Sequence, residues 1–460
     1  MTTTFLTPQQ TSAWQAFLAQ LQGIPLITDE AQIARLSQDW HSLSPVLSRQ
    51  LSDKRGDLIV CPGHEAEVVQ VAQACVAHRV PLTIRGGGMA NYGQSVPLQG
   101  GIVLDMSRMQ QICWLKPGSA RVEAGVRPLA LEKQARDMGW ELRLIPSTFR
   151  TATMAGFIAG GSGGVGSIAF GGLRARGNVL GVRVVTLEDP PRVLELRGDE
   201  IQKVNHGWGL NGILTEVEIP LAPASPWAEA ILAFRPEPGE TPQQALMRAV
   251  RCGYALAASD GIPKRLLSLQ AWPIPTYFPA LRPLVPEGSH CVQVIYFEPN
   301  HEALADLAQE YGGSLCWQKP AGEVGRSPTL MEYCFNHTVL HARAADPGIT
   351  AIQGKFPAQG GPEMVEHLVE HFGDELMMHF EYNRINGTIT GGSGHLVRFS
   401  SEERLQEMMR YEKELGCLGP NVHSYLIEEV GRNTPQLILD FKREGDPYGL
   451  LNPGKTRCLL

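Results

Sequence analysis

The sequence has no C-x-x-C pair and no excess of basic residues. Its nine cysteines, at positions 61, 75, 113, 252, 291, 316, 334, 417 and 458, are scattered. This pattern predicts reduced thiols in a cytoplasmic protein and not a zinc ribbon or disulfide framework. A formal net charge of −7 argues against nucleic acid as a partner.

The sequence also lacks a secretory signal and a convincing membrane segment. Its first ten residues contain neither a basic region nor an apolar run, so we expect no exported leader. Residues 151–173 carry no charge, but eight of these 23 residues are glycine and bulky aliphatic residues are few. We therefore expect buried ligand-binding backbone there, and no integral membrane segment.

The 460 residues are enough for two or three domains. Residues 1–50 have a helical pattern, and residues 51–224 alternate short apolar strands with amphipathic helices. The proline-rich residues 222–226 indicate a linker. Residues 225–405 predict an α+β domain on an antiparallel sheet, and residues 406–460 a C-terminal segment that returns to the first domain.

Two glycine-dense loops are the strongest chemical signal. Residues 86–88 are three consecutive glycines after an apolar strand, and residues 160–166 contain five glycines. Glycine is costly to order, so such runs indicate that backbone N–H groups come close to a ligand, often a phosphate. Two such loops predict a dinucleotide site.

The second loop contains the letters of a nicotinamide-binding fingerprint. Residues 161–166 read G-x-G-x-x-G, and Glu188 lies 22 residues beyond Gly166. That motif needs an apolar strand before the first glycine and a helix after the last. The preceding residues are small and polar, and two more glycines follow, so the context does not support a Rossmann site.

The two loops and their neighbours resemble the FAD-binding domain shared by vanillyl-alcohol oxidase and p-cresol methylhydroxylase, which D-lactate and glycolate dehydrogenases also contain. The resemblance covers residues 51–224 and 406–460. It is carried by residues 62–69, 80–88, 101–105, 122–125, 146–148, 160–167, 212–216 and 446–455. It implies an α+β fold, with a two-subdomain FAD-binding domain and a substrate domain with an antiparallel sheet that covers the flavin.

The resemblance also implies which residues contact FAD. The first loop surrounds the pyrophosphate, the second runs beside the isoalloxazine and ribityl chain, Ile213 meets the adenine end, and two C-terminal residues close the site. The implied contacts are Arg85, Gly86, Gly87, Gly88, Met89, Ala90, Gly93, Gln94, Pro146, Ser147, Thr148, Thr151, Gly156, Gly160, Gly161, Gly163, Gly164, Gly166, Ser167, Ile213, Asn452 and Lys455.

Many relatives attach the flavin covalently through a histidine that follows the paired glycines of the first loop. Met89 occupies that position here and has no nucleophilic nitrogen. We therefore expect tightly bound, non-covalent FAD. A bond from a histidine elsewhere in the chain stays open.

Candidate substrate-side residues lie mainly in the middle domain. If residues 377–387 form a strand, His379, Glu381 and Asn383 share one face, and Arg384 takes the other unless a bend intervenes. The alternative is a solvated edge strand. His337 and His423 are further candidates, with alternative roles as a core histidine and a loop-holding histidine.

The hydroxy-acid dehydrogenases of this family carry a metal-binding histidine pair and a Glu-His-Gly element, and the sequence has neither. His367 and His371 are four residues apart on a predicted helix, but no third ligand is evident, so we expect a solvated face and no metal.

The sequence therefore predicts an FAD-dependent oxidoreductase that oxidises a small alcohol or 2-hydroxy acid by hydride transfer to flavin N5. His337, His379 or His423 is the expected base, and Arg384 the expected anchor for an acidic group. The electron acceptor is open among oxygen, a quinone and a redox protein. The alternatives are a sugar or aldonolactone oxidase of the same fold and a non-catalytic flavin-binding subunit of a dehydrogenase complex.

Overall fold

A computed structural model describes residues 5–161, 163–323, 328–430 and 436–457. The chain divides into two compact units. The first unit comprises Met1–Ser162, Arg176–Pro223 and Val422–Leu460, and the second comprises Gly163–Ala175 and Ala224–Asn421.

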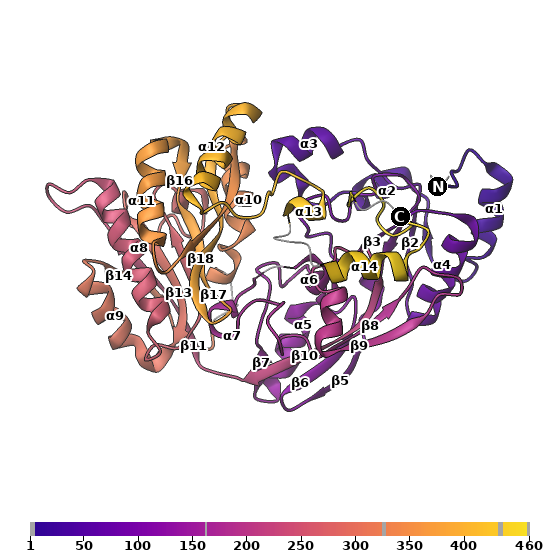
Figure 1. The fold of residues 1–460 in the computed structure, drawn as a ribbon. Helices are drawn as coiled ribbons and strands as arrows, with labels where there is room; N and C mark the ends of the chain where they lie inside the picture. The colour runs from indigo at the N-terminus through magenta and orange to yellow at the C-terminus, as the bar shows by residue number, and fades with distance from the viewer. Residues whose placement is uncertain (1–4, 162, 324–327, 431–435, 458–460) are drawn as a thin grey trace. The chain divides into compact units, whose positions relative to one another are not determined.

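The first unit begins with helices and a small sheet (Figure 1). The helical elements are α1 (Thr11–Ala19), α2 (Glu30–Leu36), η1 (His41–Leu43) and α3 (Pro45–Leu51). The sheet has the order β1 (Leu26–Ile27), β2 (Leu58–Val60), β4 (Ile102–Asp105) and β3 (Leu82–Arg85). Strands β2, β4 and β3 are parallel. Helix α4 (Glu65–His78) connects β2 to β3 and buries one apolar stripe, as its sequence pattern predicts.

A second sheet of the first unit has six antiparallel strands. Its members are β5 (Ile112–Lys116), β6 (Ser119–Glu123), β7 (Trp140–Leu142), β8 (Gly181–Val185), β9 (Val193–Arg197) and β10 (Ile213–Pro223). The helical elements in this part of the chain are η2 (Met106–Arg108), α5 (Pro128–Asp137), α6 (Met154–Gly160) and η3 (Gly198–Lys203).

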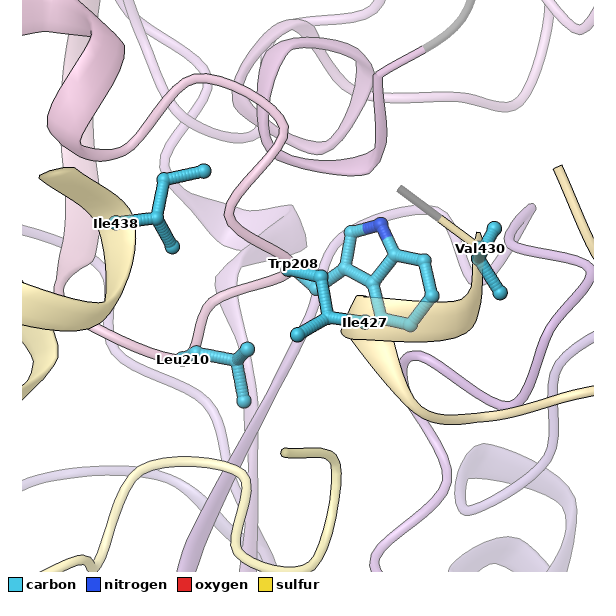
Figure 2. Close-up of a cluster of buried hydrophobic side chains, with 5 residues drawn as sticks. All are labelled: Trp208, Leu210, Ile427, Val430 and Ile438. Carbon is cyan, nitrogen blue, oxygen red and sulfur yellow. The ribbon is translucent and has the colours of Figure 1, made fainter. Parts of the chain in front are cut away.

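The C-terminal segment returns to the first unit through α13 (Ile427–Val430) and α14 (Gln436–Gly445). Figure 2 shows Ile427, Val430 and Ile438 of this segment packed with Trp208 and Leu210. Beyond α14, the carbonyl of Leu450 accepts a hydrogen bond from the N–H of Leu82 at 2.8 Å. The end of the chain therefore lies beside the strand that leads into the first glycine loop.

The second unit is built on an eight-stranded antiparallel sheet. Its order is β14 (Ser314–Lys319), β11 (Trp227–Phe234), β13 (His290–Phe297), β12 (Lys264–Gln270), β17 (His379–Ile385), β18 (Thr388–Arg398) and β15 (Ile349–Pro357), with β16 (Leu376–Met377) paired to β18. The antiparallel sheet predicted for this region is thus confirmed.

Helices pack on this sheet, and Figure 1 shows α8, α9 and α11 grouped together. The helical elements are α7 (Ser167–Phe170), α8 (Pro242–Ala258), η4 (Ile274–Tyr277), η5 (Glu298–Asn300), α9 (His301–Glu310), η6 (Leu330–Glu332), α10 (Asn336–Ala345), α11 (Gly361–Phe372), η7 (Gly373–Glu375) and α12 (Glu402–Leu415). In the described residues, no helix combines the length and the apolar character needed to cross a bilayer.

Two segments fall in a different unit from the one expected. Residues 163–175 were expected in the FAD-binding domain, but they pack with the second unit. Residues 406–421 were expected in the returning C-terminal segment, but they also belong to the second unit. Sequence composition does not show these changes, because both segments continue a neighbouring loop or helix without a linker.

Candidate functional site

The first glycine loop follows β3 and lies against the start of the second loop. A Cβ atom on Gly87 would come within 2.2 Å of the carbonyl oxygen of Thr151, and one on Gly86 within 2.3 Å of the Thr153 hydroxyl oxygen. A real Cβ does not approach a backbone atom this closely. The two loops therefore pack backbone to backbone, which is the physical reason for these glycines.

This loop leaves consecutive donors free. In the part of the chain that the structure describes, the N–H groups of Gly87, Gly88, Met89 and Ala90 donate no hydrogen bond. These residues are half-buried. Free N–H dipoles on a loop after a strand suit an anionic group such as a pyrophosphate.

The part of the second loop within the first unit forms a turn and a short helix. The carbonyl of Thr148 accepts from the N–H groups of Thr151 and Ala152, at 2.9 and 2.8 Å. The side chain of Thr153 caps α6 by accepting from the N–H of Gly156. Pro146 and Ser147 lie in the same turn.

Helix α6 ends at the fingerprint glycines. Gly161 has a φ of 67°, and a Cβ there would lie 2.2 Å from the His206 ring. A helix thus precedes the G-x-G-x-x-G letters, and only the one-turn helix α7 follows them. A Rossmann site needs a strand before and a long helix after, so the structure agrees with its rejection.

The remaining glycines of the second loop belong to the second unit. The N–H of Gly166 donates to the carbonyl of Arg265 at 2.7 Å, and the Ser167 hydroxyl contacts the side-chain oxygen of Asn383. Gly163 and Gly164 precede them in the same segment. Flavin contacts by these four residues stay a prediction.

Two C-terminal residues fasten the first loop. The side-chain amide of Asn452 donates to the carbonyls of Gln94 and Trp208, at 2.7 and 2.9 Å. The ammonium of Lys455 donates to the carbonyl of Val96 at 2.7 Å and to that of Gly93.

The Lys455 side chain is fully buried. Burial lowers its pKa to about 7, and the Asp39 carboxylate opposes this shift. Lys455 therefore fixes the first loop by hydrogen bonds to its backbone carbonyls. The sequence did not predict this role.

Buried polar atoms near these loops test whether FAD fits. Among the described residues, the Ser95 hydroxyl, the Trp208 indole N–H and the Asn452 side-chain oxygen are buried and have no hydrogen-bond partner. With the free N–H groups of the first loop, they give a donor and acceptor set that suits a polar dinucleotide. Ser95 and Trp208 were missed in the sequence, because nothing local marks them.

Two other predicted FAD contacts keep their sequence-based roles as predictions. Ile213 is buried in β10, where it pairs with Val185 of β8. Met89 is half-buried in the first loop and offers no nitrogen for a covalent bond to flavin.

In the second unit, His379 and Glu381 form a buried pair on one face of β17. The His379 Nε2 atom lies 3.0 Å from the Glu381 Oε1 atom and 3.0 Å from the Thr338 hydroxyl oxygen. Its Nδ1 atom lies 2.8 Å from the carbonyl oxygen of Gly394. Because β17 lies between β12 and β18, the edge-strand interpretation is wrong.

The Glu381 carboxylate is held by a strained turn. Its Oε1 atom accepts from the N–H of Phe335 at 2.6 Å and from the Ser268 hydroxyl at 3.4 Å. Phe335 has a φ of 53° and a ψ of −138°, which are unfavourable for a bulky residue. Surrounding contacts therefore hold this N–H against the carboxylate. Phe335 was missed in the sequence because only tertiary packing imposes this conformation.

Two other candidates belong to the same unit. His337 is on α10 beside Thr338, and burial lowers its pKa to about 4, so the ring is neutral. The Arg384 guanidinium donates to the carbonyls of Ile168 and Gly387, both at 3.4 Å. These weak bonds leave donors of the guanidinium available.

His423 belongs to the first unit, whereas His379 and Glu381 belong to the second. The His423 Nδ1 atom lies 2.8 Å from the hydroxyl oxygen of Ser44. This contact agrees with the alternative that His423 holds a loop.

In the described ranges, no three His, Cys, Asp or Glu side chains are grouped so that they could hold a metal. His367 and His371 are exposed on α11, and His371 stacks on Tyr411. The eight described cysteines are free thiols, and Cys458 lies outside the described residues.

The chain is similar to known FAD-binding proteins. Residues 56–189 match the model of the FAD binding domain. The chain is 28% identical over 234 residues to the glycolate oxidase subunit GlcD of Escherichia coli (strain K12), a match that covers 49% of this chain and 44% of that protein. It is 30% identical over 192 residues to alkyldihydroxyacetonephosphate synthase of Dictyostelium discoideum, over 39% and 30% of the two chains. The chain spans less than half the length of these curated relatives.

Solved structures extend the likeness over nearly the whole chain. A structure of alkyldihydroxyacetonephosphate synthase has a TM-score of 0.72 at 17% identity and covers 96% of this chain and 85% of its own. A structure of 6-hydroxy-D-nicotine oxidase from Arthrobacter nicotinovorans has a TM-score of 0.63 at 16% identity, over 93% and 96% of the two chains. At these identities the likeness shows the fold, and it confirms the predicted α+β class. Residues 56–189 are thus an FAD binding domain, in a chain that is similar to FAD-linked oxidoreductases.

Proposed function

We propose that the protein is an FAD-dependent oxidoreductase that oxidises a small alcohol or a 2-hydroxy acid. The observation that carries this proposal is the buried His379–Glu381 pair on one sheet face, in a chain that also contains an FAD binding domain. Bound FAD supplies a two-electron acceptor for the hydride of a C–H bond next to oxygen. GlcD and the mitochondrial D-lactate dehydrogenases, by their names, act on such acids.

The residues of the first unit would hold FAD. Backbone N–H groups of residues 87–90 would bind its pyrophosphate, while Asn452 and Lys455 fix the loop that presents them. With Met89 in the first loop, the flavin is bound without a covalent bond there.

The residues of the second unit would hold the substrate. Arg384 is half-buried and forms no ion pair within the described residues, so its planar guanidinium could bind a substrate carboxylate. The base is one of His337, His379 and His423. The neutral ring of His337 can accept a proton, whereas both nitrogens of His379 already have partners.

One observation favours a second candidate function. The GlcD relatives are named as subunits of an oxidase, so the chain could bind flavin within a complex without performing the oxidation alone. The other alternative is a sugar or aldonolactone oxidase, which would use the same cofactor but oxidise a sugar or a lactone in place of a small alcohol or 2-hydroxy acid.

The test is to purify the protein, record its absorption spectrum and precipitate it with acid. Yellow colour in the supernatant is expected, and a yellow pellet would show a covalent bond. Glycolate, D-lactate, small alcohols and aldonolactones are then added without oxygen. Bleaching by an alcohol or hydroxy acid supports the proposal, bleaching only by the lactone supports the sugar oxidase, and no bleaching supports the subunit role.

A further inference from the structure

The Glu381 carboxylate has one oxygen that the protein does not satisfy. Glu381 is 1% exposed, and among the described residues its Oε2 atom has no hydrogen-bond partner. Its Oε1 atom has the Phe335 N–H, the Ser268 hydroxyl and the His379 ring. A buried carboxylate oxygen without a donor is costly, so Oε2 can take a donor from outside the chain.

Oε2 is the open acceptor of this carboxylate. The Gly394 carbonyl can only accept, so it takes the hydrogen bond from Nδ1 of His379 at 2.8 Å. A carboxylate oxygen accepts hydrogen bonds, and the partners of Glu381 all lie on Oε1.

The backbone around Glu381 is shaped to hold the carboxylate in this orientation. Phe335 keeps its unfavourable conformation while its N–H reaches Oε1. A Cβ atom on Gly163 would lie 3.4 Å from the Phe335 ring and 3.7 Å from the Asn383 side-chain oxygen. Gly163, Phe335, Asn383 and Ser167 therefore lie close together in the second unit, at the end of β17 that carries Asn383.

We propose that Oε2 of Glu381 accepts a hydrogen bond from the hydroxyl group of the substrate, so that Glu381 anchors an alcohol or α-hydroxy compound. This assignment rests on the proposed function and narrows it. His379 and Phe335 are positioning residues, because they act on Glu381 and hold its other oxygen.

A second buried pair of the same unit provides a matched control. His395 Nε2 lies 2.7 Å from Glu412 Oε1, and both residues are fully buried. In the described structure, no backbone N–H donates to the Glu412 carboxylate, and its Oε2 atom, like that of Glu381, has no partner. The control therefore tests whether an unsatisfied carboxylate oxygen alone produces the effect. The pair joins β18 to α12, and we assign no ligand to it.

The test uses the oxidised, FAD-loaded full chain and two probes that cannot react. 2-Hydroxyisobutyrate has a hydroxyl group but no hydrogen on that carbon, and isobutyrate lacks the hydroxyl. Calorimetric titration of the wild type should show about tenfold tighter binding of 2-hydroxyisobutyrate, the effect expected for one hydrogen bond to a charged group. In Glu381→Gln the amide oxygen would keep the Phe335 bond, and the neutral –NH2 at the Oε2 position could only donate to the probe's hydroxyl oxygen. The hydrogen bond to a charged acceptor is then lost, so the preference should fall severalfold.

Glu412→Gln should keep the wild-type preference. The proposal is overturned if the wild type shows no preference, if Glu381→Gln retains it, or if both variants lose it. If Glu381→Gln does not fold, Glu381→Asp withdraws the oxygen by one methylene, and the same loss is expected. A preference in the wild type without flavin bleaching by any oxidisable alcohol would contradict the proposed function and leave this anchor standing.

Discussion

The two units present their functional groups in different ways. In the first unit the candidate site is backbone, with glycines that let two loops touch and N–H groups of residues 87–90 that are free. In the second unit it consists of side chains on β17, buried and bonded to each other. A site made of backbone groups requires that two loops approach each other closely, whereas a site made of side chains requires the correct register of neighbouring strands. An added side chain should therefore disrupt the first site, and removal of a hydrogen-bonding side chain should disrupt the second.

The largest expected effect is in the second unit. His379→Ala removes one partner of a buried pair and leaves the Glu381 carboxylate without its counterpart. The free energy of unfolding should fall by about 3–5 kcal/mol, measured by urea denaturation of the full chain. FAD content should stay equal to that of the wild type when both are folded, because residues 87–90, which are expected to bind the pyrophosphate, belong to the other unit. A selective loss of FAD would contradict this expectation.

The next effect is the pH dependence of the first unit. Lys455 has a pKa of about 7 in the folded protein, below its ordinary value of 10.5. The unfolded chain therefore binds more protons between pH 7 and about 10, and this group makes stability rise with pH across that window, by up to about 1.4 kcal/mol per pH unit. The difference in unfolding free energy between wild type and Lys455→Met, followed from pH 7 to 9, isolates this contribution. A difference that does not change with pH would show that Lys455 keeps an ordinary pKa.

The smallest of the three effects sharpens the backbone argument. Gly87→Ala would place a Cβ 2.2 Å from the Thr151 carbonyl, so the loops must separate. We expect a loss of about 1–3 kcal/mol in stability and at least about tenfold weaker FAD binding, measured by flavin titration of the apoprotein. Gly63→Ala is the control in the same unit, because its Cβ would meet only the flexible Glu67 side chain at 3.6 Å. Equal losses in both variants would refute a specific contact between the loops.

Much of the fold followed from local pattern. Strand β2 and helix α4 match the predicted alternation of apolar strands and amphipathic helices, and the second unit has the predicted antiparallel sheet. Each depends on hydrophobic periodicity, which the sequence carries directly. Helix α6 was not predicted, because its small residues lack an apolar stripe and are buried on several sides.

The sequence predicted some residues of the candidate sites and missed others. The three consecutive glycines of the first loop predicted that the backbone comes close to another group, and the structure shows that Gly86 and Gly87 lie against Thr153 and Thr151. The role of His423 was not decided by sequence, since its contact with Ser44 joins residues far apart in the chain. Strand periodicity placed His379 and Glu381 on one face, but it could not show that the strand is internal.

By itself, the sequence determined the glycine loops, the FAD-binding domain that they indicate and the substitution of Met89 for a nucleophilic residue, because these depend on residue type and spacing. Only the tertiary structure decided that residues 163–175 join the second unit, that Lys455 clasps the first loop and that Phe335 adopts a strained turn to hold Glu381. Those features need contacts between residues far apart in the chain. Their energies depend on burial and geometry, which no local pattern encodes.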